Sequence, residues 1–116
     1  MTPDPDIYYT LTRVANGDHE AFRQIFDLYS PRVYRFALKY LKSSDQAEEI
    51  VQEVFVRLWK NSKMLPDVKN LDHYLFVLSR NLAFDQLRRQ EIQARHAEEL
   101  QTDIDDSANV TEEAIL

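Results

Sequence analysis

Apolar side chains recur at intervals of three and four residues along most of this chain, and no segment alternates strictly. Intervals of three and four place side chains on one face of a helix. The longest such series follows Asp18 and comprises Phe22, Ile25, Phe26, Tyr29, Val33, Phe36, Ala37 and Tyr40. Pro31 interrupts this series and should kink or briefly break the helix, with Ser30 as a new cap.

Polar residues mark where the first two helices begin and end. A short helix is predicted over residues 7–15, because Asn16 and Gly17 follow it and stop helices. Asp18 is then suited to cap the next helix with its side chain.

A further helix is predicted after residues 43–44, where Asp45 and Glu48 have the spacing of a capping box. It should end near Asn61, with Glu53 and Arg57 as a supporting pair one turn apart. Its apolar face consists of Ala47, Ile50, Val51, Val54, Phe55 and Leu58.

Residues 62–70 predict a loop because of Pro66 and polar ends, and Asn70 is suited to cap a last helix. That helix is apolar on two sides, which is typical of a central position in a bundle. One side holds Leu71, Tyr74, Leu75, Leu78 and Leu82, and the other holds Phe76, Ala83 and Leu87. We expect it to fray by Arg95, and from Ala97 the composition predicts a flexible linker.

These elements predict an all-α fold: a compact bundle of three main helices plus a short N-terminal helix, followed by an acidic tail. The length of 116 residues suits one domain with one modest core. We place this domain at residues 1–95 and the linker at residues 96–116.

The formal net charge of −6 is unevenly distributed. Residues 18–95 hold 13 Lys or Arg against 11 Asp or Glu, whereas residues 96–116 hold seven Asp or Glu and no Lys or Arg. The acidity therefore belongs to the tail, and the helical part is mildly basic.

Residues typical of enzymes and metal sites are sparse. The chain has no cysteine, and His19, His73 and His96 are far apart, without the spacing of metal ligands. The single glycine excludes a glycine-rich phosphate loop. We therefore expect no enzyme activity, no cofactor and no metal. No apolar run is long enough to span a bilayer, which with the lack of cysteine favours a cytoplasmic protein.

A polar surface is predicted opposite the apolar face of the helix over residues 45–61. Glu49 and Glu53 are one turn apart and Gln52 lies beside them. This acid–amide patch (Glu49, Gln52 and Glu53) suits a basic protein partner. A solvated helix face has the same composition, so the residues alone leave both interpretations open.

The last helix mixes basic and aromatic residues: Arg80, Asn81, Arg88 and Arg89 lie near Tyr74, Phe76 and Phe84, and Lys63 and Lys69 flank the preceding loop. Basic groups interleaved with rings are typical of single-strand binding. The alternative is that the rings are core and the arginines complement the helix C-terminus. From these residues alone the alternative is stronger, because aromatics at helical spacing are usually buried.

Three segments, in order, resemble conserved parts of the extracytoplasmic-function (ECF) sigma factors of bacterial RNA polymerase. GDHEAF at residues 17–22 resembles the start of region 2.1, and DQAEEIVQEVFVRLW at residues 45–59 resembles region 2.2. LFVLSRNLAFDQLRR at residues 75–89 resembles regions 2.3 and 2.4. The resemblance covers about residues 10–92, so residues 1–95 are identified as a region 2 (sigma-2) domain.

This resemblance implies a transcription initiation factor that binds core RNA polymerase and recognises and melts the promoter −10 element. Glu49, Gln52 and Glu53 would dock on the clamp helices of the β′ subunit, and the loop of residues 62–70 would hold a base flipped out of the non-template strand. The implied DNA-binding residues are Lys63, Lys69, Asn70, Arg80, Asn81, Asp85, Arg88 and Arg89. Asp85 also has a structural interpretation, because its helical phase leans toward the core, where it would pair with an arginine.

In the family a second helical domain, sigma-4, reads the −35 element. This chain reaches only residue 116, inside what resembles the acidic linker, so we expect a fragment of a longer protein. The resemblance also leaves room for an anti-sigma factor as a partner. Two other functions stay open: a helical interaction module without a DNA role, and a small metal-dependent hydrolase, which the scattered histidines disfavour.

Overall fold

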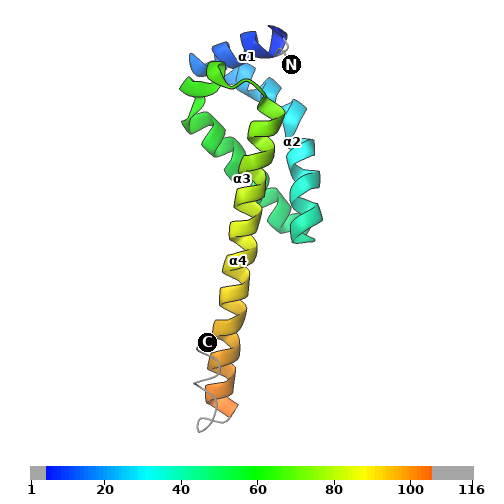
Figure 1. The fold of residues 1–116 in the computed structure, drawn as a ribbon, viewed down its shortest axis with the longest axis vertical. Coiled ribbons are helices and arrows are strands. Elements are labelled where there is room, and N and C mark those ends of the chain that lie inside the picture. The colour runs from blue at the N-terminus through cyan, green and yellow to red at the C-terminus, as the bar shows by residue number, and fades with distance from the viewer. Residues whose placement is uncertain (1–4, 106–116) are drawn as a thin grey trace. The chain divides into compact units, whose positions relative to one another are not determined.

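Helices make up nearly all of the chain between residues 5 and 105, which are the residues that this computed structural model describes. The elements are α1 (Pro5–Ala15), α2 (His19–Leu41), α3 (Ser44–Lys60), the 3₁₀ helix η1 (Ser62–Asp67) and α4 (Leu71–Asp105) (Figure 1). No strand occurs within residues 5–105. The predicted all-α bundle of three main helices plus a short N-terminal helix is confirmed.

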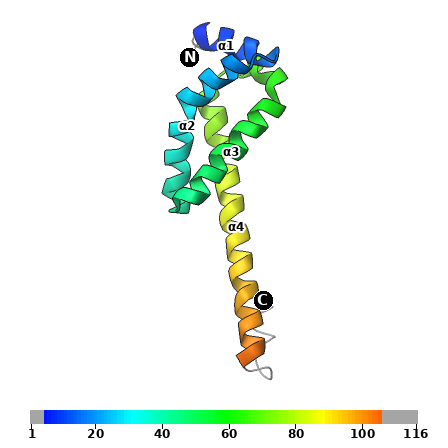
Figure 2. The ribbon, with the colours of Figure 1, turned by 180° about the vertical axis from the view of Figure 1, so that it is seen from behind.

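The chain forms two compact units, residues 1–83 and residues 84–116. In the first unit, α1 packs against α2 and η1, and α2 packs against α3 (Figure 2). The part of α4 up to Ala83 completes this unit and buries Leu71, Leu75, Ser79, Leu82 and Ala83.

The second unit holds the remaining described part of α4, and here the prediction of an early helix end is wrong. The helix continues past Arg95 to Asp105. Its residues include many good helix formers, and Arg95 pairs with Glu91 one turn earlier at 2.6 Å, so the local sequence sustains the helix. Residues 106–116, the rest of the predicted linker, lie outside the described residues.

The core of α2 is a stripe with a strict interval of four. Its buried residues are Ala21, Ile25, Tyr29, Val33, Ala37 and Leu41. The predicted face was only partly right, because Phe26 is 36% exposed and Phe22, Phe36 and Tyr40 are half-buried. These rings flank the buried stripe. For α3 the predicted apolar face matches the buried set in full.

α2 runs without a break through Pro31, contrary to the predicted kink or interruption with Ser30 as a cap. Proline removes a backbone donor and costs about 3 kcal/mol inside a helix. Pro31 is exposed, so its ring does not disturb the core. Tyr29 and Val33, on either side of it, both keep their buried positions in the stripe. Burial of the two side chains contributes about 1.5–3 kcal/mol each, enough to offset the proline.

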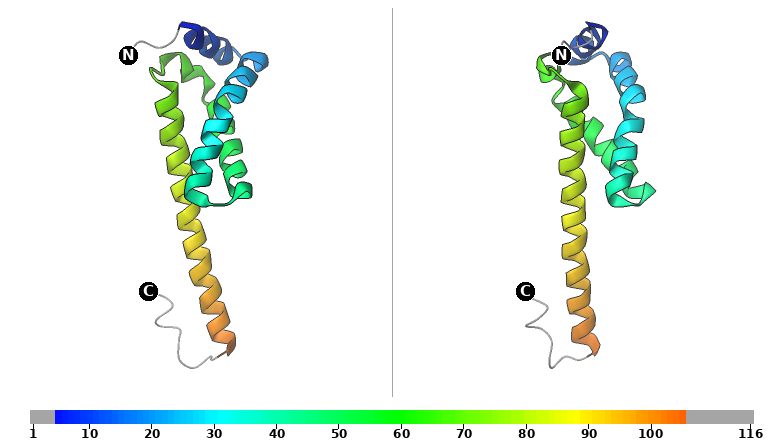
Figure 3. Two further views of the ribbon diagram at one scale, coloured as in Figure 1. Left: turned by 90° about the vertical axis from the view of Figure 1, so that its right-hand side faces the viewer. Right: turned by 45° about the vertical axis from the view of Figure 1, so that its right-hand side comes forward.

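A two-residue turn joins α2 to α3 and reverses the chain (Figure 3). Lys42 ends α2 in the left-handed conformation, with φ of 56°, and its backbone N–H donates to the Leu38 carbonyl. Ser43 then begins α3, because its hydroxyl oxygen accepts from the Gln46 N–H. The cap of α3 is therefore Ser43, and the predicted capping box of Asp45 and Glu48 is not the one used.

The segment predicted as a loop contains η1 and is anchored in the core. Leu65 is fully buried in η1, as is Val14 at the end of α1, the helix on which η1 packs. Pro66 lies inside η1, where its fixed φ suits a tight turn. After η1, the predicted cap is confirmed: the Asn70 side-chain oxygen accepts from the His73 N–H at 3.0 Å.

Asp18 ties the end of α1 to the start of α2. One carboxylate oxygen accepts from the backbone N–H groups of Glu20 and Ala21, which confirms the predicted cap. The other accepts from the Arg13 guanidinium, at 2.7–2.8 Å. The backbone N–H of Ala21 and then the Arg13 side chain hold the pKa of Asp18 below its ordinary value.

We predict that Leu65→Ala lowers the free energy of unfolding by about 2–5 kcal/mol, the range for truncating a buried leucine. Urea unfolding followed by circular dichroism measures it. Met64→Ala is the matched control, because Met64 is the neighbouring residue of η1 but is 43% exposed, and it should cost less than about 1 kcal/mol. Equal losses in the two variants would contradict a core anchor at Leu65.

We predict that Asp18→Asn lowers the urea midpoint at about pH 7, because asparagine can still cap α2 but cannot pair with Arg13. Since the folded pKa of Asp18 is lowered, its carboxylate stabilises the fold above the unfolded pKa, and this contribution is lost as pH falls through the folded pKa. The difference in urea midpoint between wild type and variant should therefore decrease toward about pH 3. Asp27→Asn is the control, since Asp27 lies 4.0 Å from Arg23 and caps nothing, and it should give little gap at either pH.

Candidate functional site

The acid–amide patch lies on the outer side of α3. Glu49 and Gln52 are exposed and Glu53 is half-buried. Glu53 pairs with Arg57 at 3.1 Å, as its spacing predicted. The patch is therefore accessible to a partner, because none of its three side chains is buried in the core.

An aromatic groove adjoins this patch, and the sequence interpretation missed it. The α2–α3 groove has a volume of about 560 Å³ and is lined from both helices. Its lining includes His19, Phe22 and Phe26 of α2, and Gln52, Phe55 and Trp59 of α3. Gln52 thus belongs both to the acid–amide patch and to the wall of the groove.

Ring contacts hold the walls of the α2–α3 groove together. His19 stacks on Trp59 with ring centroids 4.8 Å apart, and Phe22 meets the same indole edge-on at 5.0 Å. Phe26 meets Phe55 edge-on at 4.9 Å. The signal in the sequence was two aromatic pairs at i, i+4 spacing, Phe22–Phe26 and Phe55–Trp59. The two pairs belong to separate predicted helices, and the sequence alone does not indicate that these helices meet there.

A second hollow continues from Gln52 toward the proline of α2. It has a volume of about 340 Å³ and is lined by Phe26, Ser30, Pro31, Tyr34, Glu48, Val51 and Gln52. Gln52 and Phe26 line both hollows, so the side chain of Gln52 lies at the centre of one continuous α2–α3 surface. This surface is apolar at its floor and acidic at its edge.

The predicted DNA-binding residues around η1 are exposed, but one of them also forms a hydrogen bond within the fold. Lys63, Lys69 and Asn70 all face solvent. The side-chain oxygen of Asn70 caps α4 through the His73 N–H, so that oxygen has a structural task. The side-chain NH₂ of Asn70 is the part that remains to donate to a ligand.

On α4 within the first unit, Arg80 is half-buried and Asn81 is exposed. The Arg80 guanidinium lies over the ring of Phe76, 6.0 Å from its centroid. Phe76 is 44% exposed, so the expectation of a buried ring fails here. A cation on an exposed ring is the arrangement that single-strand binding uses.

The second unit holds the other three predicted DNA-binding residues. Asp85 is half-buried and accepts a hydrogen bond from Arg88, so it pairs with an arginine as its structural interpretation expected. Arg89 donates to the Gln86 side chain at 3.2 Å. Arg88 and Arg89 are both exposed, and Phe84, also expected in the core, is 48% exposed.

The residues that the structure describes form neither a metal site nor a membrane span. Among them, no group of three or more His, Cys, Asp or Glu side chains is placed to hold a metal ion. No helix within the same part of the chain is long and apolar enough to cross a membrane.

Comparison with known proteins identifies the family. The sequence profile of sigma-70 region 2 matches residues 25–92, more than half of the chain. The chain belongs to the sigma-70 region 2 family. The match runs from the second turn of α2 into α4 and includes the acid–amide patch and the residues of η1.

The relatives of this sigma-70 region 2 chain include ECF sigma factors, which confirms the resemblance seen in the sequence. The ECF RNA polymerase sigma factor SigW of Bacillus subtilis is 28% identical over 81 residues, covering 70% of this chain and 43% of SigW. The ECF RNA polymerase sigma factor SigK of Mycobacterium tuberculosis is 29% identical over 84 residues, covering 72% and 45%. SigK of Mycolicibacterium vanbaalenii is 30% identical over 82 residues, covering 70% and 42%.

The sigma-70 region 2 chain therefore spans less than half the length of these curated relatives. No solved structure matches it significantly.

Proposed function

We propose that this chain is the region 2 part of an ECF sigma factor, a transcription initiation factor and not an enzyme. In this proposal it binds core RNA polymerase and recognises and melts the promoter −10 element. The observation that carries the proposal is the family match over residues 25–92, combined with two exposed polar surfaces inside it.

The polymerase-binding side is proposed to be the acid–amide patch together with the α2–α3 groove. Glu49, Gln52 and Glu53 would meet basic groups of the β′ clamp helices, and the rings of the groove would receive apolar side chains from the same helices. An apolar centre with a charged rim is the usual anatomy of a protein interface. Aromatic side chains in such a centre carry much of the binding energy.

The residues proposed to contact DNA are Lys63, Lys69, Asn70, Arg80 and Asn81 of the first unit and, taken separately, Asp85, Arg88 and Arg89 of the second. Residues 62–70 would hold a base flipped from the non-template strand. Unstacking a base costs a few kcal/mol, and stacking on an exposed ring returns about 1–3 kcal/mol. The modest positive charge predicts weak binding by the chain alone, so polymerase would supply position and avidity.

An interaction module without a DNA role shares the α2–α3 surface with this proposal. It needs neither the cation on Phe76 nor the exposed Asn81. An anti-sigma factor would be compatible with either function. The two functions differ in whether the complex with polymerase captures single-stranded −10 DNA.

We predict that Gln52→Ala weakens binding to core polymerase about five- to thirty-fold, the effect of truncating a central interface residue. Glu53→Lys should weaken it further, because it places a like charge against the basic partner. Affinity is measured by pull-down titration with immobilised core polymerase. Gln24→Ala, an exposed amide of α2 outside both hollows, is the control and should bind as wild type. Unchanged affinity in Gln52→Ala and Glu53→Lys would refute the docking assignment.

We predict that Asn81→Ala weakens capture of single-stranded −10 DNA by the chain–polymerase complex about ten-fold, because an amide side chain that reads a base edge is lost. The measurement is selection from an oligonucleotide pool with a randomised −10 segment, followed by sequencing and affinity determination. Gln93→Ala, an exposed amide further along α4, is the matched control. If the wild-type complex enriches no −10 sequence from the pool, the result would favour the interaction module instead.

A further inference from the structure

Residues 62–70, which are proposed above to hold a flipped base, are fixed at both ends by the neighbouring α-helices. Before them, the Asn61 side chain donates to the Arg57 carbonyl at 3.0 Å, so Asn61 belongs to the end of α3. After them, Asn70 caps α4, and Leu71, the first residue of α4, is buried. The two ends of the segment are therefore placed by α3 and α4.

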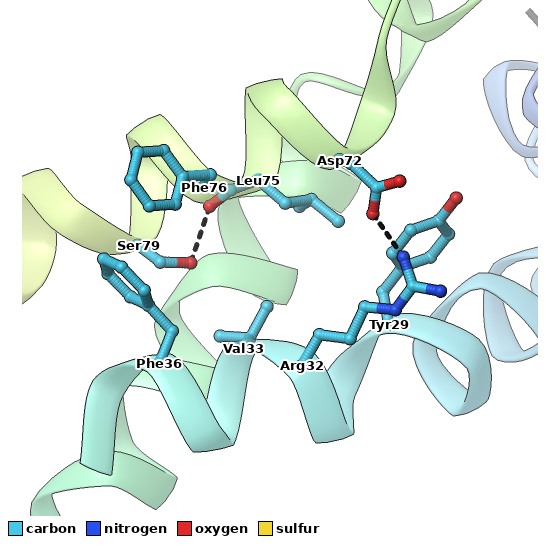
Figure 4. A pocket seen from close by; sticks show the side chains of 8 residues that line it. All are labelled: Tyr29, Arg32, Val33, Phe36, Asp72, Leu75, Phe76 and Ser79. Atoms are coloured by element: carbon cyan, nitrogen blue, oxygen red, sulfur yellow. Dashed lines mark hydrogen bonds and ion pairs between the residues drawn. The ribbon is translucent and has the colours of Figure 1, made fainter. Parts of the chain in front are cut away.

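The first turns of α4 are in turn fixed on α2 at two points. Arg32 of α2 pairs with Asp72 of α4 at 2.6 Å (Figure 4). One turn farther along each helix, Phe36 meets Phe76 edge-on with ring centroids 4.8 Å apart. Between these contacts lies the α2–α4 pocket, a hollow of about 180 Å³ with mostly apolar walls. The start of α4 therefore has a fixed position on α2.

The middle of the segment, η1, has much less to hold it. The hydrogen bonds of a 3₁₀ helix have poorer geometry than those of an α-helix, so a six-residue 3₁₀ helix depends on packing. Among residues 62–67, all of which the structure describes, Leu65 is the one buried side chain. Its neighbours Lys63 and Met64 are exposed. The position of η1 is therefore set by what surrounds Leu65.

The helix that packs against η1 is α1, and the two lie side by side at one end of the first unit (Figure 1). The buried side chains of α1 are Leu11, which is 2% exposed, and Val14, which is fully buried. Because they are three residues apart, they share one face of α1. Leu65 of η1 is fully buried as well. Packing of η1 on this face of α1 thus anchors the middle of residues 62–70.

The orientation of α1 is fixed from α2. Gly17 joins the two helices with φ of 87°, a conformation that favours glycine, and its N–H donates to the Val14 carbonyl at 2.9 Å. The Asp18 N–H donates to the Arg13 carbonyl at 3.0 Å. The Arg13 guanidinium pairs with the same Asp18 carboxylate that caps α2. With 11 residues, α1 is too short to be stable alone, so these contacts and its packing determine where it lies.

We propose that Leu11 and Val14 of α1 are positioning residues for base recognition, because they hold Leu65 and so set the geometry in which residues 62–70 receive the flipped base. The proposal rests on the proposed function and adds a determinant of base choice that does not itself contact DNA. Binding groups discriminate between ligands only when they are held within about 0.5 Å of the productive geometry. Residues 5–15 lie outside the family match over residues 25–92, so that match assigns them no role.

The first measurement follows η1 without polymerase or DNA, as amide hydrogen exchange by NMR in the 116-residue chain. The Val68 N–H donates to the Leu65 carbonyl at 3.0 Å and reports on the end of η1. Val14→Ala should accelerate its exchange about ten-fold, because the truncation leaves a cavity on the face that η1 packs against. The Tyr74 N–H, which donates to the Asn70 carbonyl in α4, should exchange as in wild type.

Val54→Ala is the matched control for this measurement. Val54 of α3 is as fully buried as Val14 and loses the same two methyl groups, but it lies on neither α1 nor η1. The variant should therefore lose stability without faster exchange at Val68. A thermal melt by circular dichroism checks that both variants are folded at the temperature of the experiment.

Arg13→Gln loosens α1 without a cavity in the core, because it cuts the ion pair with Asp18. It should accelerate exchange at Val68 about three-fold, less than the core truncation does. Arg23→Gln removes the same charge from α2 at a side chain that is 82% exposed, and should leave this exchange unchanged. If Val14→Ala does not fold, Arg13→Gln takes its place in both measurements.

The second measurement is selection of single-stranded −10 DNA from the randomised pool by the chain–polymerase complex. Val14→Ala should lower the enrichment of the preferred base at one position of the −10 segment about three- to ten-fold, while its affinity for core polymerase stays within about two-fold of wild type. Val54→Ala should keep the wild-type enrichment at that position. A role in stability alone would change both variants alike.

Three results would overturn the proposal. The first is exchange at Val68 that is no faster in Val14→Ala than in Val54→Ala, which means that α1 does not hold η1. The second is faster exchange with unchanged enrichment, which means that the position of η1 does not determine base choice. The third is an equal loss of enrichment in both variants. A wild-type complex that enriches no −10 sequence would instead remove the proposed function, and with it the role in base choice, while the exchange result for η1 would still stand.

Discussion

The arrangement of the first unit depends on how α2 buries one side chain in every four residues. A row at intervals of four is inclined to the axis of a helix with 3.6 residues per turn, so the buried stripe winds around α2. Its early members are flanked by Phe22 and Phe26, which meet the rings of α3. Farther along, the flanking ring is Phe36, which meets Phe76 of α4 instead. One helix therefore contributes aromatic walls to two separate hollows.

The sequence predicted the buried face of α3 completely and that of α2 only in part, and the reason is the same winding. Over the length of α3, the positions at three- and four-residue intervals stay on one side. In α2 the same rule also selected Phe22 and Phe26, which lie beside the buried stripe. The prediction broke α2 at Pro31 because it gave the proline more weight than the burial of its neighbours. It ended α4 too early because it gave the acidic composition more weight than the ion pairs along the helix.

The polar side chains proposed for binding could be named from the sequence, whereas the hollows beside them could not. Glu49, Gln52 and Glu53 follow from the helical phase of α3 alone. The α2–α3 groove and the α2–α4 pocket require knowing which helices meet, and their walls come from segments far apart in the chain. The sequence also does not show when one side chain has two predicted roles that compete. Asn70 is such a case, because the side chain that caps α4 is also the one proposed to contact DNA.

Trp59 is the single tryptophan of the chain, and it lies in the wall of the α2–α3 groove with His19 stacked on it at 4.8 Å. Indole emission responds to the polarity of its surroundings and to nearby quenching groups. The indole emission of the unmodified chain thus originates from this one surface, whereas the six tyrosines emit at shorter wavelength. Binding events at this groove can therefore be followed by tryptophan fluorescence without a label.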